Sequence, residues 1–426
     1  MRKRSKKTYI FHEDQLPRLI SWASSFEYFS FLNGNKYPAL HGSFPEILFV
    51  GKSDALESNN DSFEKLNQFI IGRRDWQYGY FSYDLKNEIE ELESKNATTI
   101  PVNHLGFYIP ETIIHIKKGE LIIESLHETD KVFQAINTHE ITSGTLVTSI
   151  DQLTSQTPKW QYIDHVKKIK DEIVKGEFYE MNYCIEFTAN ALSFDPLSCY
   201  QQLNILSPMP FSSFMRIGGN YLICSSPERF VKKDGNTLIS QPIKGTIRRS
   251  FDKKEDEQLK KALKESEKEQ AENLMIVDLV RNDLAKSAKT GSVKVDELFG
   301  IYTFKKVHQM ISTVTATKKQ SIPVSEVIKH AFPMGSMTGA PKIRAMEEID
   351  KLEHTARGLY SGAVGYISPD QDFDFNVVIR SIIYNSEMNK LSFHVGSAIT
   401  YDSDPEYEYR ECLLKAESLM QVLTRK

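Results

Sequence analysis

The pattern of apolar and polar residues changes at residues 149–159. Before this stretch, short apolar runs such as 113–116 and 121–123, separated by turn residues, predict strands joined by tight turns. Residues 149–159 are rich in Asp, Gln, Thr, Ser and Pro, which favour loops. We therefore expect a soft boundary here, between an N-terminal region, residues 1–150, and a second region, residues 160–426.

Three segments after the boundary carry apolar residues at helical spacing. In residues 162–175 the apolar positions recur at intervals of three and four, and Gly176 closes the segment. The same spacing runs through residues 261–286. A third helix is predicted after Asp404 and Pro405, because an N-cap residue followed by proline is typical of a helix start.

Continuous apolar runs predict strands at residues 183–188, 221–224, 362–367 and 375–383. Helices and strands do not alternate regularly along the chain. The pattern therefore predicts an α+β fold rather than a series of βαβ units.

The composition is that of an ordinary globular protein. The chain has 426 residues, 40% of them hydrophobic, and a formal net charge of -4, so neither nucleic acid nor an anionic membrane is an expected partner. Its apolar runs end far short of the roughly 20 residues that span a bilayer. The basic residues 1–7 are not followed by the apolar segment of a secretory signal, which predicts a cytoplasmic location.

The four cysteines show neither Cys-x-x-Cys spacing nor neighbouring histidines. This excludes an obvious zinc site or disulfide framework and predicts buried, reduced thiols. The four residues are Cys184, Cys199, Cys224 and Cys412.

Two acidic pairs lie at i, i+3 on predicted helices: Glu269 with Glu272, and Glu408 with Glu411. A solvated charged face accounts for one such pair at least as well as a ligand role does. Glu272 and Glu411, however, each directly precede an apolar run, at the margin of a buried surface. If the four carboxylates converge there, they require a cation, and all-oxygen ligation suits Mg²⁺.

Two further features suit the binding of anions. Lys415 shares a helix face with Glu411, so it can pair with that carboxylate or with a carboxylate of a substrate. The Gly/Ser/Thr-rich segment 332–342 leads to proline at a helix start, where backbone N–H groups can bind anions. A purely structural turn is an equally good interpretation of this segment.

Three basic or titratable side chains are candidates for chemistry. Lys244 lies between an apolar residue and a glycine, where partial burial and nearby Arg248 and Arg249 would lower its pKa, although a surface lysine is the ordinary alternative. Arg380 lies inside a predicted apolar strand, and a buried guanidinium requires an anionic partner. His308 fits either a satisfied core histidine or a proton donor.

The residues of these segments and the order of the segments along the chain resemble the chorismate-binding enzyme family, which includes anthranilate, aminodeoxychorismate, isochorismate and salicylate synthases. The resemblance covers roughly residues 160–426. It implies an α/β sandwich of two large, mostly antiparallel sheets with helices outside, into which residues 1–150 also pack. Six segments carry the resemblance: 226–230, 242–246, 271–284, 335–342, 357–362 and 402–415.

Within the family, the residue at position 244 distinguishes two branches. Anthranilate synthases resemble Pro-Ile-Ala-Gly-Thr, whereas aminodeoxychorismate synthases resemble the Pro-Ile-Lys-Gly-Thr found here at 242–246. The resemblance thus implies Mg²⁺-dependent amination of chorismate to 4-amino-4-deoxychorismate in folate precursor synthesis. Lys244 would add covalently to C2 and expel the C4 hydroxyl before ammonia enters at C4. Anthranilate synthase component I is the alternative, which the lysine opposes.

The resemblance also implies roles for individual residues. Glu228 would be the general acid/base, and His308 would lie near the departing hydroxyl. Arg380 and Tyr360 would hold the enolpyruvyl carboxylate. Mg²⁺ would be bound by Glu272 and Glu411, with Glu269 and Glu408 in support. The remaining substrate contacts would be Thr246, Gly335, Ser336, Gly396 and Lys415.

The sequence departs from the family pattern at two places. Glu180 stands where isochorismate and salicylate synthases carry a water-activating lysine and where amination enzymes usually carry glutamine, so water addition is disfavoured. Gly396, Ser397 and Ala398 replace a more glycine-rich stretch, which adds β-carbons where a substrate could approach the backbone.

No glutaminase motif is visible, since no Gly-x-Cys-x-Gly sequence with a downstream His-x-Glu is found. We therefore expect ammonia to come from solution or from a separate glutamine amidotransferase subunit. No pyridoxal-phosphate lyase region follows, so the expected product is aminodeoxychorismate. Metal-assisted phosphoryl transfer and a non-catalytic binding role are alternatives, but the first lacks a nucleotide motif, and the retained Lys244 and four glutamates oppose the second.

Overall fold

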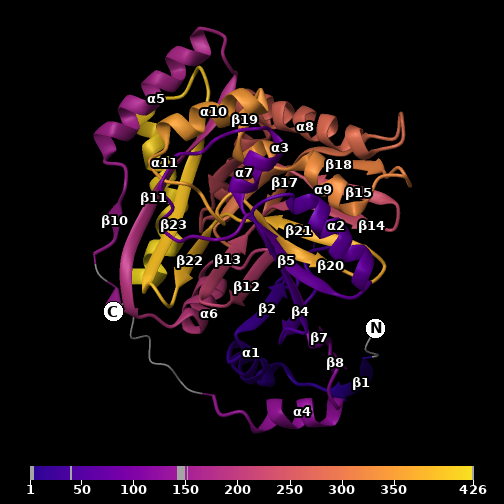
Figure 1. Ribbon diagram of the computed structural model, residues 1–426. Helices are drawn as coiled ribbons and strands as arrows, with labels where there is room; N and C mark the ends of the chain where they lie inside the picture. Colours follow the sequence, from indigo (N-terminus) through magenta and orange to yellow (C-terminus); the bar gives the residue numbers. More distant parts are fainter. Residues whose placement is uncertain (1–3, 39–40, 142–148, 151, 425–426) are drawn as a thin grey trace.

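The computed structural model describes residues 4–38, 41–141, 149–150 and 152–424. Two large sheets face each other, and most helices lie on their outer sides (Figure 1). The strand ladders in both sheets are antiparallel, which confirms the predicted α+β sandwich.

Within the described residues, the larger sheet contains 13 strands. Its continuous order is β1 (Ser5–Ile10), β8 (Glu120–Ser125), β7 (Thr112–Lys117), β3 (Ile47–Val50), β2 (Tyr28–Asn33), β12 (Phe211–Ile217), β13 (Asn220–Ser226), β22 (Ser381–Asn385), β23 (Lys390–Ile399), β11 (Glu180–Ser193) and β10 (Thr154–Ser155). Two short strands also pair with β11: β9 (Ser149–Ile150) and β19 (Gly339–Ala340).

The second sheet contains 10 strands in the described part of the chain. Its order is β16 (Ile243–Arg248), β18 (Val307–Thr317), β15 (Thr237–Gln241), β14 (Arg229–Asp234), β21 (Phe373–Val377), β20 (Ala363–Ile367), β5 (Gln77–Phe81), β6 (Leu105–Ile109) and β4 (Asp54–Ser58), and β17 (Lys294–Thr303) also pairs with β18. Strands from before and after residue 150 pair in both sheets, as β2 does with β12 and β5 with β20.

The helices cover the sheets and connect them. They are α1 (Leu16–Ser24), α2 (Ser62–Arg73), α3 (Lys86–Ile89), α4 (Thr129–Thr138), α5 (Lys159–Val174), α6 (Pro196–Leu206), α7 (Lys253–Glu265), α8 (Glu267–Ser287), α9 (Val324–Ala331), α10 (Lys342–Leu352) and α11 (Pro405–Thr424), with short 3₁₀ turns η1 (Glu13–Gln15), η2 (Tyr83–Leu85) and η3 (Gly335–Met337). Among the described residues, none of the helices has both the length and the apolar character needed to cross a membrane.

The apolar side chains form two main cores. One fills the space between the sheets and extends under α8 and α9, with Phe49, Phe107 and Phe375 among its members. The other lies between the larger sheet and the outer helices and contains Val166 of α5 and Phe393 of β23. Successive side chains of a strand point to opposite faces. β23 therefore buries its odd-numbered residues in this second core and turns its even-numbered residues toward the space between the two sheets.

Two predicted elements are divided in the structure. The helix predicted at 261–286 is two helices, because Ser266 has an extended backbone and serves as the N-cap of α8. The strand predicted at 375–383 is also two strands, β21 and β22, which belong to different sheets. Arg380 therefore lies in the crossover between them, with φ of 50°, and not inside a strand.

Candidate active site

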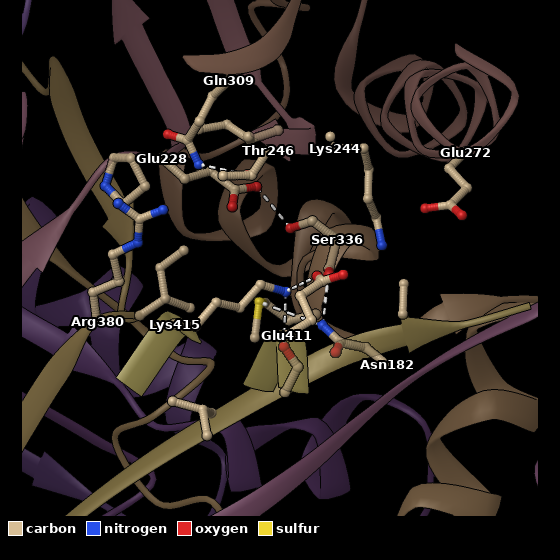
Figure 2. A pocket seen from close by; sticks show the side chains of 18 of the residues that line it. Asn182, Glu228, Lys244, Thr246, Glu272, Gln309, Ser336, Arg380, Glu411 and Lys415 are labelled. Carbon is tan, nitrogen blue, oxygen red and sulfur yellow. Dashed lines mark hydrogen bonds and ion pairs between the residues drawn. The ribbon is translucent and has the colours of Figure 1, made fainter. Parts of the chain in front are cut away.

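One pocket between the two sheets brings together all the predicted site residues except His308 and Gly335. Its walls come from β11, β16 and β23 and from the pocket-facing sides of α8 and α11. The predicted residues that line it are Glu228, Lys244, Thr246, Glu269, Glu272, Ser336, Tyr360, Arg380, Gly396, Glu408, Glu411 and Lys415. Figure 2 shows Lys244 and Glu272 at one side and Arg380 at the other.

A bulge in β16 directs Lys244 into this pocket. The pairing of β16 with β18 shifts register between Ile243 and Thr246, and Gly245 adopts φ of 89°, a conformation that favours glycine. The side chain of Lys244 is 9% exposed and its ammonium donates a hydrogen bond to the carboxylate of Glu180, which is 1% exposed. Lys244 is therefore a buried amine held by one carboxylate.

The expected lowering of the Lys244 pKa is wrong. Burial alone lowers this pKa, but the carboxylates of Glu180 and Glu272 outweigh burial and raise the pKa above its ordinary value. Arg249 does not oppose them, because it pairs with Asp256 at 2.8 Å. Lys244 is thus protonated at neutral pH and must lose a proton before it can act as a nucleophile.

Glu228 lies between β13 and β14 and is almost fully buried. Burial raises the pKa of this carboxyl to about 7, although Ser336 donates a hydrogen bond of 2.7 Å that favours the charged form. A carboxyl group with this pKa can donate and accept protons near neutral pH. Its position and pKa suit the general acid/base predicted from the sequence.

Arg380 is a cation without a carboxylate partner among the described residues. Within the described residues, its guanidinium makes one weak hydrogen-bond contact, of 3.9 Å with the sulfur of Met209. Burial lowers its pKa to about 10, so it stays charged at neutral pH. Tyr360 is also buried, and its hydroxyl contacts the thiol of Cys184 at 3.8 Å. Both groups can therefore accommodate an anionic group of a ligand.

The four predicted metal-binding glutamates come from the first two turns of α8 and α11. Burial raises the pKa of Glu272 to about 7, and it raises the pKa values of Glu269 and Glu408 as well. One buried oxygen of Glu272 has no hydrogen-bond partner in the described part of the chain. The ammonium of Lys268 lies 3.7 Å from the carboxylate of Glu272 and 3.9 Å from that of Glu408, so it already neutralises part of the charge of these glutamates.

These residues suit Mg²⁺ in their donor chemistry. Carboxylate oxygens are the ligands that Mg²⁺ prefers, and the Glu272 oxygen that contacts Lys268 at 3.7 Å makes no hydrogen bond to a described residue. In the described part of the chain, however, no three acidic, histidine or cysteine side chains are close enough to form a ready-made metal cluster. Mg²⁺, which usually keeps several waters, therefore remains a proposal.

Lys415 connects the glutamates to the wall formed by β23. It pairs with Glu411 at 2.7 Å and donates to the carbonyl oxygen of Gly396 at 2.9 Å. This ion pair lowers the pKa of Glu411. A β-carbon at position 396 would come within 2.4 Å of the sulfur of Cys184, so only glycine allows β23 to approach β11 here.

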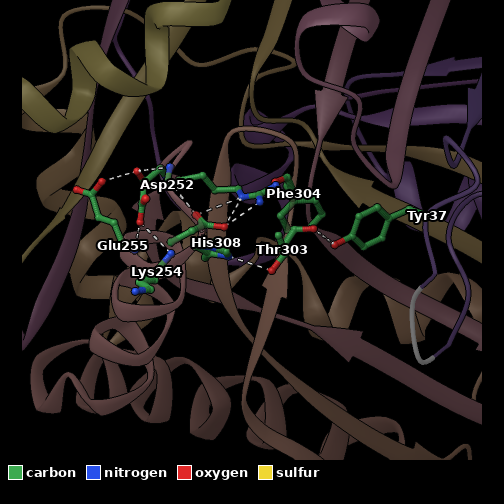
Figure 3. Close-up of polar contacts among 10 residues, drawn as sticks. Tyr37, Asp252, Lys254, Glu255, Thr303, Phe304 and His308 are labelled. Atoms are coloured by element: carbon green, nitrogen blue, oxygen red, sulfur yellow. Dashed lines mark hydrogen bonds and ion pairs between the residues drawn. The ribbon is translucent and has the colours of Figure 1, made fainter.

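His308 lies outside the pocket, contrary to the expected position near the departing hydroxyl. Its ring contacts Asp256 at 3.0 Å and Thr303 at 2.9 Å (Figure 3). Side chains alternate along β18, so the next residue, Gln309, lines the pocket instead. Gln309 donates to the hydroxyl of Thr246 at 3.2 Å and keeps a buried oxygen without a partner.

Gly335 also differs from its expected position. It lines a smaller cavity that adjoins the pocket at Glu228 and Ser336, and a β-carbon there would meet the side chain of Leu279 at 3.1 Å. Gly335 therefore allows η3 to pack closely on α8, and Ser336 supplies the contact with the pocket.

Sequence reasoning missed several residues that line the pocket, among them Asn182, Lys268, Gln309 and His394. Strand alternation could have found His394, because it lies two residues before Gly396 and so shares its face.

Comparisons with known proteins identify the family of the chain. A family model described as chorismate binding enzyme matches residues 25–421. The probable chloroplastic aminodeoxychorismate synthase of Oryza sativa subsp. japonica is 36% identical over 384 residues, which cover 81% of this chain and 43% of the rice protein. Aminodeoxychorismate synthase component 1 of Escherichia coli strain K12 is 33% identical over 349 residues, which cover 82% of this chain and 76% of that protein.

The fold is shared with a solved structure. Anthranilate synthase component I from Streptococcus pneumoniae superposes with a TM-score of 0.77 at 24% identity, covering 92% of this chain and 96% of that one. The chain spans less than half the length of the rice protein. Because the family model matches nearly the whole chain, the chain belongs to the chorismate binding enzymes.

Proposed function

We propose that this chain aminates chorismate with ammonia to give 4-amino-4-deoxychorismate, the precursor of the 4-aminobenzoate part of folate. The observation that carries the proposal is the buried amine of Lys244, in a pocket that also contains a carboxyl group with a pKa of about 7. The names of the rice and Escherichia coli relatives support the same reaction.

Chorismate carries two carboxylates, one on the ring and one on the enolpyruvyl group. Arg380 and Tyr360 would hold the enolpyruvyl carboxylate, because Arg380 has no carboxylate partner in the described chain. The ring carboxylate would then lie toward the glutamates of α8 and α11. When bound by Glu272 and Glu411, with Glu269 and Glu408 in support, Mg²⁺ would neutralise that carboxylate.

The first half of the reaction requires two proton transfers. The ammonium of Lys244 would give its proton to Glu180, the carboxylate to which it is already hydrogen-bonded. The free amine nitrogen would form a bond to C2 while the C4–O bond breaks and the double bond shifts. Glu228 would donate its proton to the departing hydroxyl, which leaves as water.

The second half of the reaction reverses these steps. Ammonia would form a bond to C4 as the C2–N bond to Lys244 breaks, so that the lysine leaves as a free amine. Glu228, now ionised, would take the surplus proton from the new amino group, and Glu180 would return its proton to Lys244. Synthesis of anthranilate is disfavoured, because Lys244 occupies the side from which ammonia would reach C2.

We expect the purified chain to use ammonium but not glutamine as its nitrogen source. Amide hydrolysis needs a reactive thiolate, and burial raises the pKa of Cys184 to about 12 and that of Cys412 to about 11, with the other two cysteines raised as well. The test supplies chorismate and Mg²⁺ with either nitrogen source and identifies the product by mass spectrometry. A separate glutamine amidotransferase subunit should confer glutamine-dependent synthesis, and the name component 1 of the Escherichia coli relative supports such a partner.

The Lys244→Ala variant, purified in parallel, controls for contaminating synthase. Glutamine-dependent synthesis by the single chain after gel filtration would contradict the expected partner. Failure to convert chorismate with ammonium would contradict the proposed function itself.

The pH dependence should report the protonation of Glu228. Because its pKa is about 7, kcat/KM for chorismate at a fixed concentration of free ammonia should fall as the pH rises through about 7 and the acid loses its proton. At constant total ammonium, the growing fraction of free ammonia opposes this fall. The measurement therefore uses buffers in which free ammonia is held constant.

Ser336→Ala is the matched control for this assignment. Ser336 donates to the carboxylate of Glu228 and lowers its pKa, so its removal should move the fall in kcat/KM to higher pH. An unchanged midpoint in Ser336→Ala would show that a group other than Glu228 controls the profile.

A further inference from the structure

His394 presents an unsatisfied polar ring to the pocket. It lies on β23, lines the pocket and is 3% exposed. Both of its ring nitrogens are buried, and neither has a hydrogen-bond partner among the described residues. Buried polar groups are nearly always paired, so ring nitrogens in a pocket wall that no described residue pairs with point to a hydrogen bond with a bound ligand.

The neighbours of His394 hold its ring in place but leave its nitrogens free. The ring stacks on Tyr360, with centroids 5.0 Å apart and planes at 13°. Glu186 lies opposite it on β11, but its carboxylate accepts hydrogen bonds from Thr99 at 2.8 Å and Ser392 at 2.6 Å. The imidazole is therefore oriented by packing, and its hydrogen-bonding capacity is unused.

Donor groups gather at this end of the pocket, and the carboxylates that act on them already have partners: Glu228 accepts a hydrogen bond from Ser336, and Glu353 pairs with Arg357. Arg380 immediately precedes β22, the strand that pairs with β23, and its guanidinium has no carboxylate partner among the described residues. Tyr360, which the ring of His394 contacts, supplies a hydroxyl. Burial lowers the pKa of His394, so the ring is neutral at pH 7 and offers one N–H donor.

We infer that His394 is a substrate-binding residue that donates a hydrogen bond to an oxygen of the enolpyruvyl group of chorismate. The inference deepens the proposed function and rests on it for the identity of the ligand. The enolpyruvyl group has a carboxylate and an ether oxygen, both of them acceptors, which complement the donors of Arg380 and His394. The ring carboxylate, at the other end of the pocket, is outside the reach of this interaction.

The test measures chorismate binding to His394→Phe by calorimetry, with Mg²⁺ present and ammonium absent. Phenylalanine keeps a ring on Tyr360 and removes both nitrogens. We expect the Kd for chorismate to rise about tenfold or more, as for the loss of a hydrogen bond to a charged group. Benzoate, which has the ring carboxylate but no enolpyruvyl group, should bind within twofold of its parent affinity.

His165→Phe is the matched control. His165 is also buried and contacts an aromatic ring, that of Tyr183, but its nitrogen is paired with the Tyr183 hydroxyl at 2.7 Å and it does not line the pocket. This variant should leave chorismate affinity unchanged. An unchanged Kd in His394→Phe, or equal weakening of chorismate and benzoate, would overturn the inference and leave a water-satisfied or purely structural histidine.

A second pair of variants covers the case in which His394→Phe does not fold. Glutamine and methionine are similar in size, but only glutamine can donate a hydrogen bond. His394→Gln should bind chorismate more tightly than His394→Met, and equal affinities would overturn the inference. Because binding is measured without turnover, a parent protein that binds chorismate but does not aminate it would contradict the proposed function alone.

Discussion

Lys244→Ala is expected to lower the formation of 4-amino-4-deoxychorismate at least about a thousandfold, because the variant lacks the nucleophile that forms the covalent intermediate. Slow formation of anthranilate is the expected residual activity, since ammonia can then reach C2 itself. The measurement is product identification by mass spectrometry together with kcat for each product. Synthesis of aminodeoxychorismate at the parent rate would refute covalent catalysis by Lys244.

The same substitution should also lower the melting temperature. It leaves the buried carboxylate of Glu180 without its ammonium partner, and breaking a buried ion pair in this way costs about 3–5 kcal/mol. The double variant with Glu180→Gln should recover stability without recovering amination. Lys244→Arg is the third variant, and it separates the charge of Lys244 from its role as a nucleophile. Arginine keeps the charge beside Glu180 but stays protonated, so it cannot add to C2.

Local periodicity predicted the elements that lie against a single core. The helices expected at 162–175 and after Pro405 correspond to α5 and α11, whose apolar faces pack on the larger sheet. The break at Ser266 and the crossover at Arg380 were missed, because the apolar pattern continues across both. A strand that changes sheets keeps apolar residues on both sides of the change, so hydrophobicity alone does not reveal it.

The sequence motifs located most of the pocket but not its electrostatics. The pKa of Lys244 depends on Glu180, which is 64 residues away along the chain. The prediction of a lowered pKa, which considered the nearby arginines, was therefore wrong. The error at His308 has a geometric cause, because a difference of one residue in a strand reverses the side-chain direction and places Gln309 in the pocket. The sequence pattern thus predicted neither ion pairs between residues far apart in the chain nor the direction of side chains along a strand.

Glu272→Gln should abolish both amination and the response of the enzyme to Mg²⁺, because glutamine keeps the shape of the side chain but removes the charge that a divalent cation requires. We expect the loss of kcat to be at least about a hundredfold, and Glu411→Gln should behave similarly. The measurement is the rate of chorismate amination over a titration of Mg²⁺, with a chelator-treated sample as the zero point.

The melting temperature is the second measurement. Substitution of a residue needed for folding lowers the melting temperature, whereas substitution of a residue needed only to hold the cation does not. Burial and the nearby carboxylates of Glu180 and Glu269 already disfavour the charged form of Glu272, so removing the charge should leave the metal-free melting temperature equal or higher. Glu267→Gln, an exposed position on the same helix, should change neither activity nor Mg²⁺ response. An active Glu272→Gln protein that still responds to Mg²⁺ would mean that these glutamates form only a charged rim and do not hold the cation.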